Sequence, residues 1–331
     1  MNKIYTELQN EMKNILNVDE EVDISVPKSK EFGHLTSNIA LKFSKKLNRT
    51  PREVYQIIKG QISYTSLNIK RIDFIEPGFI NFILTDKWFE IYGRELIENS
   101  ILIHKISIEN CLFKYIDKAK NNMYNRAYLI TEQMNNIIEI INKKQNGNKD
   151  VKIINVSRKQ NKDKTNIVVK PFQQDEECFV NLSVENMFFY SCSKNRSTLV
   201  NISLDKAFTN SLNNPYNYVT YPYLRANNII KLLKNEGYNY NNINAEYLFD
   251  DNKARELFLK YLTIGDVITE AVKYYEPYKL LAFLKELSDI FYEYNNKLLI
   301  RKMNKNRIEV NLFILKIYTE VVEKIMNLLK I

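Results

Sequence analysis

Apolar positions near the start of the chain recur with a helical period. Ile4, Leu8 and Met12 lie at helical spacing, and a second helical run covers residues 37–47. Because both runs are amphipathic, we expect two helices that pack on a small sheet.

A third helix and two strands follow in this region. Thr50 followed by Pro51 indicates a helix start, because threonine caps the first turn and proline fits the first helical position. Residues 69–75 then alternate, a Pro-Gly pair interrupts the pattern, and residues 79–84 resume as a β-rich run. The pattern predicts a hairpin or two adjacent strands, and a compact α+β domain over residues 1–86.

The centre of the chain mixes helical and strand-like segments. Residues 87–141 have a mostly helical and rather polar pattern. Residues 151–154 and 167–169 have the composition of strands. We therefore expect a reduced α/β region over residues 87–212.

Helical patterns fill nearly all of the remaining chain. Two apolar stripes, over residues 280–291 and 312–329, predict two long antiparallel helices. Such stripes are typical of core, so we assign them no chemistry. The fold class expected is α+β, with an all-α helical bundle over residues 213–331.

Positive charge is concentrated in one segment. The chain is 45% hydrophobic and 26% charged, an ordinary globular balance, with a formal net charge of +9. Residues 143–170 hold nine basic and two acidic residues, a net +7 of that +9. Two interpretations stay open: a loop that contacts phosphates through Lys159, Lys162 and Lys164, or a solvated, mobile connection between strands.

The scarce residues exclude several kinds of site. No two of the seven glycines lie within ten positions of each other, so no Gly-x-Gly-x-x-Gly turn, P-loop or Gly-x-Ser-x-Gly elbow is present in the sequence. The two histidines, His34 and His104, are far apart and form no local metal-binding pair. The sequence therefore predicts no metal and no cofactor.

Cysteine usage indicates a reducing environment. Cys111, Cys178 and Cys192 are an odd number without a Cys-x-x-Cys spacing, and we expect all three to be buried small apolar residues. No signal peptide and no long apolar run is visible, which predicts a cytoplasmic protein without a membrane partner. The acidic residues 175–177 read as a solvated turn rather than a metal site.

Three N-terminal segments resemble a known domain. Residues 32–42 (Phe-Gly-His-Leu-Thr-Ser-Asn-Ile-Ala-Leu-Lys), 50–54 (Thr-Pro-Arg-Glu-Val) and 75–82 (Ile-Glu-Pro-Gly-Phe-Ile-Asn-Phe) are similar to the additional N-terminal domain of arginyl-tRNA synthetase. The resemblance implies a surface that receives the D-loop of tRNA, with Phe79 stacking on a base and Asn81 bonding a base edge. The alternative is that Phe79 is core and Asn81 a turn residue.

The C-terminal third resembles the DALR anticodon-binding domain of the same enzyme. Residues 213–225 match the stretch where that helical domain begins, and residues 276–284 match its Glu-Pro-x-x-Leu helix. Lys330 stands where the family usually has glycine. The resemblance implies contacts to the anticodon side of a tRNA by Tyr218, Tyr221, Tyr223 and Arg225.

The centre resembles the end of the synthetase catalytic domain without its ATP motifs. Residues 162–167 (Lys-Asp-Lys-Thr-Asn-Ile) stand in place of the Lys-Met-Ser-Lys type loop, and two histidines so far apart cannot form His-x-Gly-His. About 65 residues separate Leu84 from Val151, too few for a complete nucleotide-binding domain, since one βαβ unit takes roughly 30. We expect the adenylation site to be deleted and the protein not to be an enzyme.

The leading hypothesis is a non-catalytic arginyl-tRNA synthetase-like protein that binds tRNA, arginine tRNA above all, through its two end domains. One alternative is an adaptor or regulator that docks on a synthetase or a tRNA-modifying enzyme. Another is a residual arginine-tRNA ligase. An exposed apolar patch within residues 87–140 would favour the adaptor.

Overall fold

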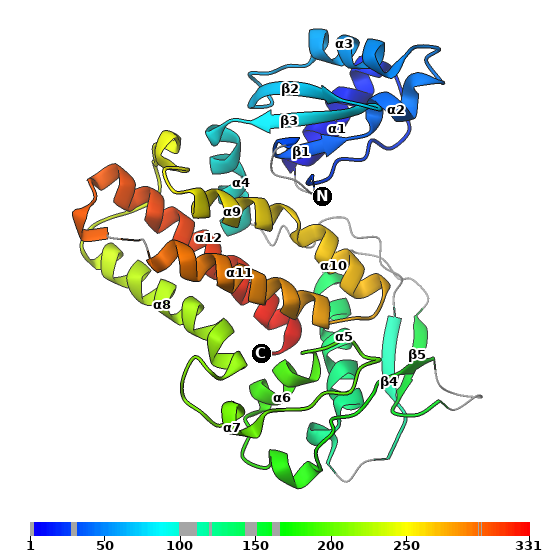
Figure 1. Ribbon diagram of the computed structural model, residues 1–331, viewed down its shortest axis with the longest axis vertical. Coiled ribbons are helices and arrows are strands. Elements are labelled where there is room, and N and C mark those ends of the chain that lie inside the picture. The colour runs from blue at the N-terminus through cyan, green and yellow to red at the C-terminus, as the bar shows by residue number, and fades with distance from the viewer. Residues whose placement is uncertain are drawn as a thin grey trace. The chain divides into compact units, whose positions relative to one another are not determined.

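A computed structural model describes residues 3–27, 32–98, 111–118, 121–142, 151–160, 166–296, 298 and 300–331 (Figure 1). Its contacts divide the chain into two compact units, each assembled from separate stretches. Unit 1 comprises Met1–Ile101, Tyr238–Thr263 and Ile300–Ile314. Unit 2 comprises Leu102–Gly237, Ile264–Leu299 and Leu315–Ile331. The division into domains at residues 86 and 212 stays a prediction.

The N-terminal part of unit 1 is the expected α+β domain. Its antiparallel sheet has the strand order β1-β3-β2, and helices gather against it (Figure 1). The predicted hairpin is confirmed, because Ile75 pairs with Phe79 across a Glu-Pro-Gly turn. The elements are α1 (Lys3–Leu16), β1 (Leu35–Ser37), α2 (Ile39–Ser44), α3 (Pro51–Gln61), β2 (Ile69–Ile75) and β3 (Phe79–Leu84).

The start of α3 is confirmed in detail. The Thr50 hydroxyl accepts a hydrogen bond from the Glu53 N–H (3.3 Å), and the Glu53 carboxylate accepts one from the Thr50 N–H (2.7 Å). Pro51 occupies the first helical position. This reciprocal cap satisfies two N–H groups that the first turn leaves without helical partners.

Unit 1 also contains helices from later in the sequence. The hydroxyl of Tyr92, on α4 (Asp86–Glu98), donates to the Tyr261 carbonyl of α9 (Asn252–Leu262) at 2.9 Å. The rings of Phe89 and Phe258 meet edge to face, 5.8 Å between centroids. The short turn η5 (Ala245–Tyr247) belongs to the same unit.

Unit 2 contains a three-stranded parallel sheet of order β4-β5-β6, with α5 alongside it (Figure 1). Its elements are β4 (Cys111–Tyr115), η3 (Asn122–Tyr124), α5 (Arg126–Asn142), β5 (Lys152–Ser157), β6 (Ile167–Val168) and η4 (Glu176–Phe179). Strands β5 and β6 confirm the two predicted strands. The helical expectation for this stretch is wrong at β4, a strand of five residues in which the exposed Leu112 breaks the alternation of apolar and polar positions.

The edge of β4 is closed by a side chain. The Phe113 N–H donates to Asn135 Oδ1 (2.8 Å), and the Phe113 carbonyl accepts from Asn135 Nδ2 (2.9 Å). Asn135 thus takes the place of a neighbouring strand at the centre of this edge.

The rest of unit 2 is helical, and the two long C-terminal helices are confirmed. Phe291 and Tyr318, one from each of these helices, stack with ring centroids 3.9 Å apart. Residues 315–329 of α12 belong to this unit, together with the last two residues of the chain. The elements are α6 (Val184–Ser191), α7 (Leu204–Ala207), α8 (Pro215–Asn235), α10 (Ile264–Lys273), α11 (Tyr278–Asn296), η6 (Ile300–Lys302, in unit 1) and α12 (Lys305–Leu329).

Two of the three cysteines behave as expected. Cys111 and Cys192 are buried, whereas Cys178 is exposed on the η4 turn, so the expectation for Cys178 is wrong. None of the three forms a disulfide.

Candidate nucleic-acid interface

The two N-terminal candidates lie on the same strand but differ in exposure. Phe79 opens β3 and is 39% exposed, so it is not a core residue. Asn81 is 3% exposed and pairs through its backbone with Thr36 on one side and Asp73 on the other. Because Asn81 lies within the central strand, Phe79 is the residue of this pair that presents surface to a ligand.

Phe79 belongs to a small exposed apolar group at the hairpin, here called the hairpin patch: Leu41, Ile75 and Phe79. Ile75 is the register partner of Phe79, and both are more than a third exposed. Leu41 lies against the turn, since its N–H donates to the Gly78 carbonyl at 3.2 Å. A Cβ at Gly78 would come within 2.8 Å of the Leu41 Cβ, which explains the glycine.

Three of the four C-terminal candidates share one face of α8. Tyr218, Tyr221 and Arg225 stand at positions i, i+3 and i+7, the spacing of one helical face. Tyr221 is 41% exposed, and Arg225 is exposed as well. Tyr223 lies on another face, where burial and the Glu323 carboxylate raise the pKa of its hydroxyl.

A proline inside α8 leaves one backbone carbonyl without its usual N–H donor, and a side chain of another helix supplies the donor. Pro222 has no N–H, so it cannot donate to the carbonyl of Tyr218 four residues earlier. The Tyr292 hydroxyl from α11 donates to that carbonyl instead, at 3.2 Å. The rings of Tyr218 and Tyr292 pack together with centroids 4.8 Å apart.

The hydroxyl of Tyr218 is also committed. It donates to Oδ1 of Asp289, an exposed residue of α11, at 2.7 Å. Burial, and then the Asp289 carboxylate, raise the pKa of Tyr218 to about 12, which keeps the hydroxyl protonated and donating at neutral pH. Sequence reasoning missed Tyr292 and Asp289, although the helix-interior proline signals that the Tyr218 carbonyl needs a donor.

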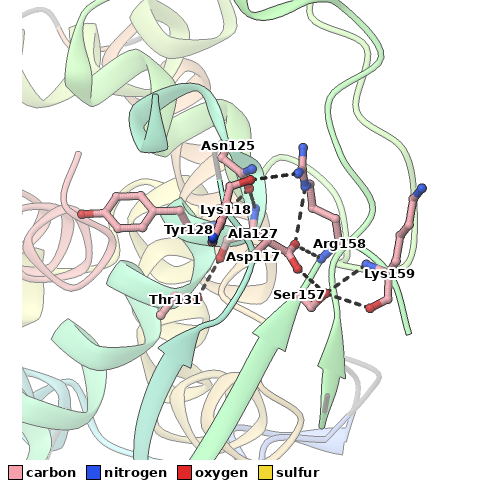
Figure 2. A network of polar contacts seen from close by, with 9 residues as sticks. All are labelled: Asp117, Lys118, Asn125, Ala127, Tyr128, Thr131, Ser157, Arg158 and Lys159. Carbon is pink, nitrogen blue, oxygen red and sulfur yellow. Dashed lines mark hydrogen bonds and ion pairs between the residues drawn. The ribbon is translucent and has the colours of Figure 1, made fainter. Parts of the chain in front are cut away.

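The three candidate lysines of the basic segment follow the carboxyl end of β5. Lys162 and Lys164 lie outside the described residues, and Lys159 is exposed. The Asp117 carboxylate accepts from the Arg158 N–H (2.7 Å), and its other oxygen lies 2.8 Å from the Ser157 hydroxyl. In Figure 2 the Lys159 side chain extends away from this network. Asp117 thus fixes the backbone after β5 and pairs with Arg158, and Lys159 extends outward from that fixed point.

Among the described residues, no three His, Cys, Asp or Glu side chains gather closely enough to hold a metal ion. The described helices also include none with the length and apolar character needed to cross a membrane.

Two family models match the ends of the chain. Residues 2–84 match the arginyl tRNA synthetase N terminal domain, and residues 219–331 match the DALR anticodon binding domain. The intervening residues, including the parallel sheet, lie outside both matches.

Curated relatives and solved structures agree with these matches. The chain is 29% identical to arginine–tRNA ligase of Mycoplasma mobile over 133 residues, which are 39% of this chain and 24% of the relative. It is 35% identical to that of Thermotoga maritima over 95 residues, 25% of this chain and 17% of the relative. The chain thus spans about a quarter or less of the length of these relatives.

Arginyl-tRNA synthetase from Plasmodium falciparum shares the fold. The TM-score is 0.65 at 12% identity, covering 99% of this chain and 98% of that one. The chain therefore carries an arginyl-tRNA synthetase N-terminal domain and a DALR domain, and through both it is related to the arginyl-tRNA synthetases.

Proposed function

We propose that this protein binds tRNA, specifically arginine tRNA, through its N-terminal and DALR domains, and that it does not aminoacylate. One observation carries the proposal. Two domains related to the tRNA-contacting ends of a synthetase flank a centre whose sequence has neither ATP-binding motif. Three cysteines outside any disulfide are consistent with a cytoplasmic site of action.

The exposed aromatic residues supply contacts suited to unpaired nucleotides. Phe79, in the hairpin patch, offers a ring face on which a splayed base can stack. On α8, Tyr221 offers a second ring, and Arg225 adds a cation for a phosphate or a base plane. Lys159 adds a phosphate contact at the end of the parallel sheet.

The absence of catalysis is proposed from the sequence and one side chain. His34, one of only two histidines, is half-buried, and its Nδ1 accepts the Leu84 N–H at 2.9 Å. This imidazole is committed to the N-terminal domain, so it is not available for the His-x-Gly-His chemistry of ATP binding.

Filter binding of arginine tRNA, with arginine-dependent ATP–pyrophosphate exchange in the same preparation, tests the proposal. We expect retention of the tRNA and no exchange above background. Phe79→Ala and Tyr221→Ala should each weaken binding about tenfold, the effect of losing one stacked base. Leu212→Ala, which removes an exposed side chain outside both surfaces, is the matched control. Exchange above background would contradict the claim that catalysis is absent.

One observation favours the docking alternative. Leu112 of β4 and Ile153 of β5 are register partners, 48% and 58% exposed, so they form an apolar pair on one face of the parallel sheet. Such a pair suits a protein partner, such as a synthetase or a tRNA-modifying enzyme, better than RNA. Ile153→Asp should abolish capture of that partner while leaving tRNA affinity unchanged; unchanged capture would dismiss the pair as a docking site.

A further inference from the structure

Asp289 stands where an RNA-facing surface would ordinarily avoid a carboxylate. It is exposed on α11 beside the face of α8 that carries Tyr218. A negative charge there repels phosphates, so it lowers the affinity for any RNA that does not contact it favourably. A structural partner for the Tyr218 hydroxyl need not be charged. We therefore infer that the Asp289 carboxylate selects among RNA ligands and does more than hold the Tyr218 hydroxyl in place.

The surroundings hold Asp289 in one orientation. Pro222 frees the Tyr218 carbonyl, the Tyr292 hydroxyl occupies it, and the two rings pack 4.8 Å apart. The Tyr218 hydroxyl is thereby directed at Asp289 Oδ1, 2.7 Å away. A charge-assisted hydrogen bond of this length fixes the carboxylate before any ligand arrives.

Aromatic and cationic groups adjoin the same place. Tyr221 and Arg225 follow Tyr218 on the same face of α8, three and seven residues later, and both are exposed. An exposed ring and an arginine, on the helical face of the tyrosine that holds the carboxylate, provide a stacking face, a countercharge and a hydrogen-bond acceptor for an unpaired base.

We propose that Asp289 determines base specificity by accepting a hydrogen bond from the exocyclic amino group of an unpaired base. This inference rests on the proposed tRNA-binding function and deepens it. An ionised carboxylate is acceptor-only, so it pairs with the exocyclic amino group of cytosine, adenine or guanine, a group that uracil lacks. It is repelled by uracil, whose one N–H lies between two carbonyl oxygens. The surface therefore discriminates against uracil.

Two hairpin RNAs with the same stem, one with a loop of cytidines and one with a loop of uridines, test this inference. We expect the protein to prefer the cytidine loop by about tenfold, within the range of one base-specific contact. Asp289→Asn should bring the ratio close to one, because a carboxamide both donates and accepts. Glu293→Gln, which removes a carboxylate one turn further along α11, should keep the preference.

The outcomes separate this inference from the function on which it rests. An equal preference in the protein and in Asp289→Asn, with tRNA still retained, would overturn the role of Asp289 alone. If the protein retains neither hairpin and no tRNA, both this inference and the proposed tRNA-binding function are overturned. Tyr218→Phe keeps the ring but frees the carboxylate, so it should reduce the preference without unfolding the bundle, which circular dichroism would verify.

Discussion

The backbone conformation of Lys330 gives a physical reason for the glycine that is usual at this position of the family. Lys330 replaces the glycine usual in the family, and it adopts φ +59°, the left-handed conformation that glycine accepts without strain. Its ammonium lies 3.0 Å from the Glu132 carboxylate of α5. An ion pair thus accompanies a backbone conformation that lysine disfavours.

Substitution at position 330 separates the two contributions. Lys330→Ala keeps the strained backbone and loses the ion pair, whereas Lys330→Gly loses the ion pair but relieves the strain. We expect the glycine variant to be more stable than the alanine variant by about 1 kcal/mol, measured by urea unfolding. Equal stability of the two variants would show that the left-handed backbone costs nothing here.

His34 predicts a pH dependence of stability. Burial, and then the positive charge of Arg255, lower the pKa of His34 to about 4, below the 6.5 of an exposed histidine. Because the unfolded chain binds the proton more readily, the free energy of unfolding should fall as the pH drops from about 6.5 to about 4. The slope should approach 1.4 kcal/mol per pH unit.

The control for that slope keeps the hydrogen bond and removes the titration. In His34→Asn the amide oxygen can accept the Leu84 N–H in place of Nδ1. Urea unfolding at pH 7 and pH 5 should show a smaller loss of stability in this variant. The same loss in both proteins would assign the pH dependence to other groups.

One buried side chain that was not predicted from the sequence, Arg126, connects α5 to several segments of unit 2. Arg126, at the start of α5, is 1% exposed, and its guanidinium donates to the backbone carbonyls of five residues. The acceptors are Lys170, Ser191, Lys194, Asn195 and Thr198. Burial lowers the pKa of Arg126 to about 10, so it remains charged at neutral pH.

Replacing this guanidinium should be among the most destabilising changes in unit 2. Arg126→Lys retains the charge but has three donors on one nitrogen and cannot reach five carbonyls. We expect a loss of about 3 kcal/mol in thermal or urea unfolding, from buried carbonyls left without donors. A loss below about 1 kcal/mol would mean that water replaces these bonds.

Local patterns predicted the elements that carry their own signals. The capped start of α3, the hairpin at residues 69–84 and the two long C-terminal helices all followed from periodicity and turn residues. Strand β4 did not, because it has only five residues and the exposed Leu112 interrupts its apolar–polar alternation. The hydrogen bonds that link Tyr292, Tyr218 and Asp289 could not be predicted from the sequence either, because they depend on how α8 and α11 pack.

At the scale of the whole molecule, the uneven charge predicts how RNA affinity responds to salt. The logarithm of affinity should fall linearly with the logarithm of salt concentration, and Lys159→Gln should reduce that slope by up to about one. Lys46→Gln is the matched control, because Lys46 already lies 2.6 Å from Glu20. An unchanged slope in Lys159→Gln would remove this lysine from the interface.

We propose that a chain related to arginyl-tRNA synthetase recognises tRNA without an adenylation site. Retention of total cellular tRNA at two salt concentrations, followed by sequencing of the bound fraction, tests it most directly. We expect enrichment of arginine tRNAs that persists at the higher salt concentration. Absence of retention, or retention without preference among tRNAs, would contradict it.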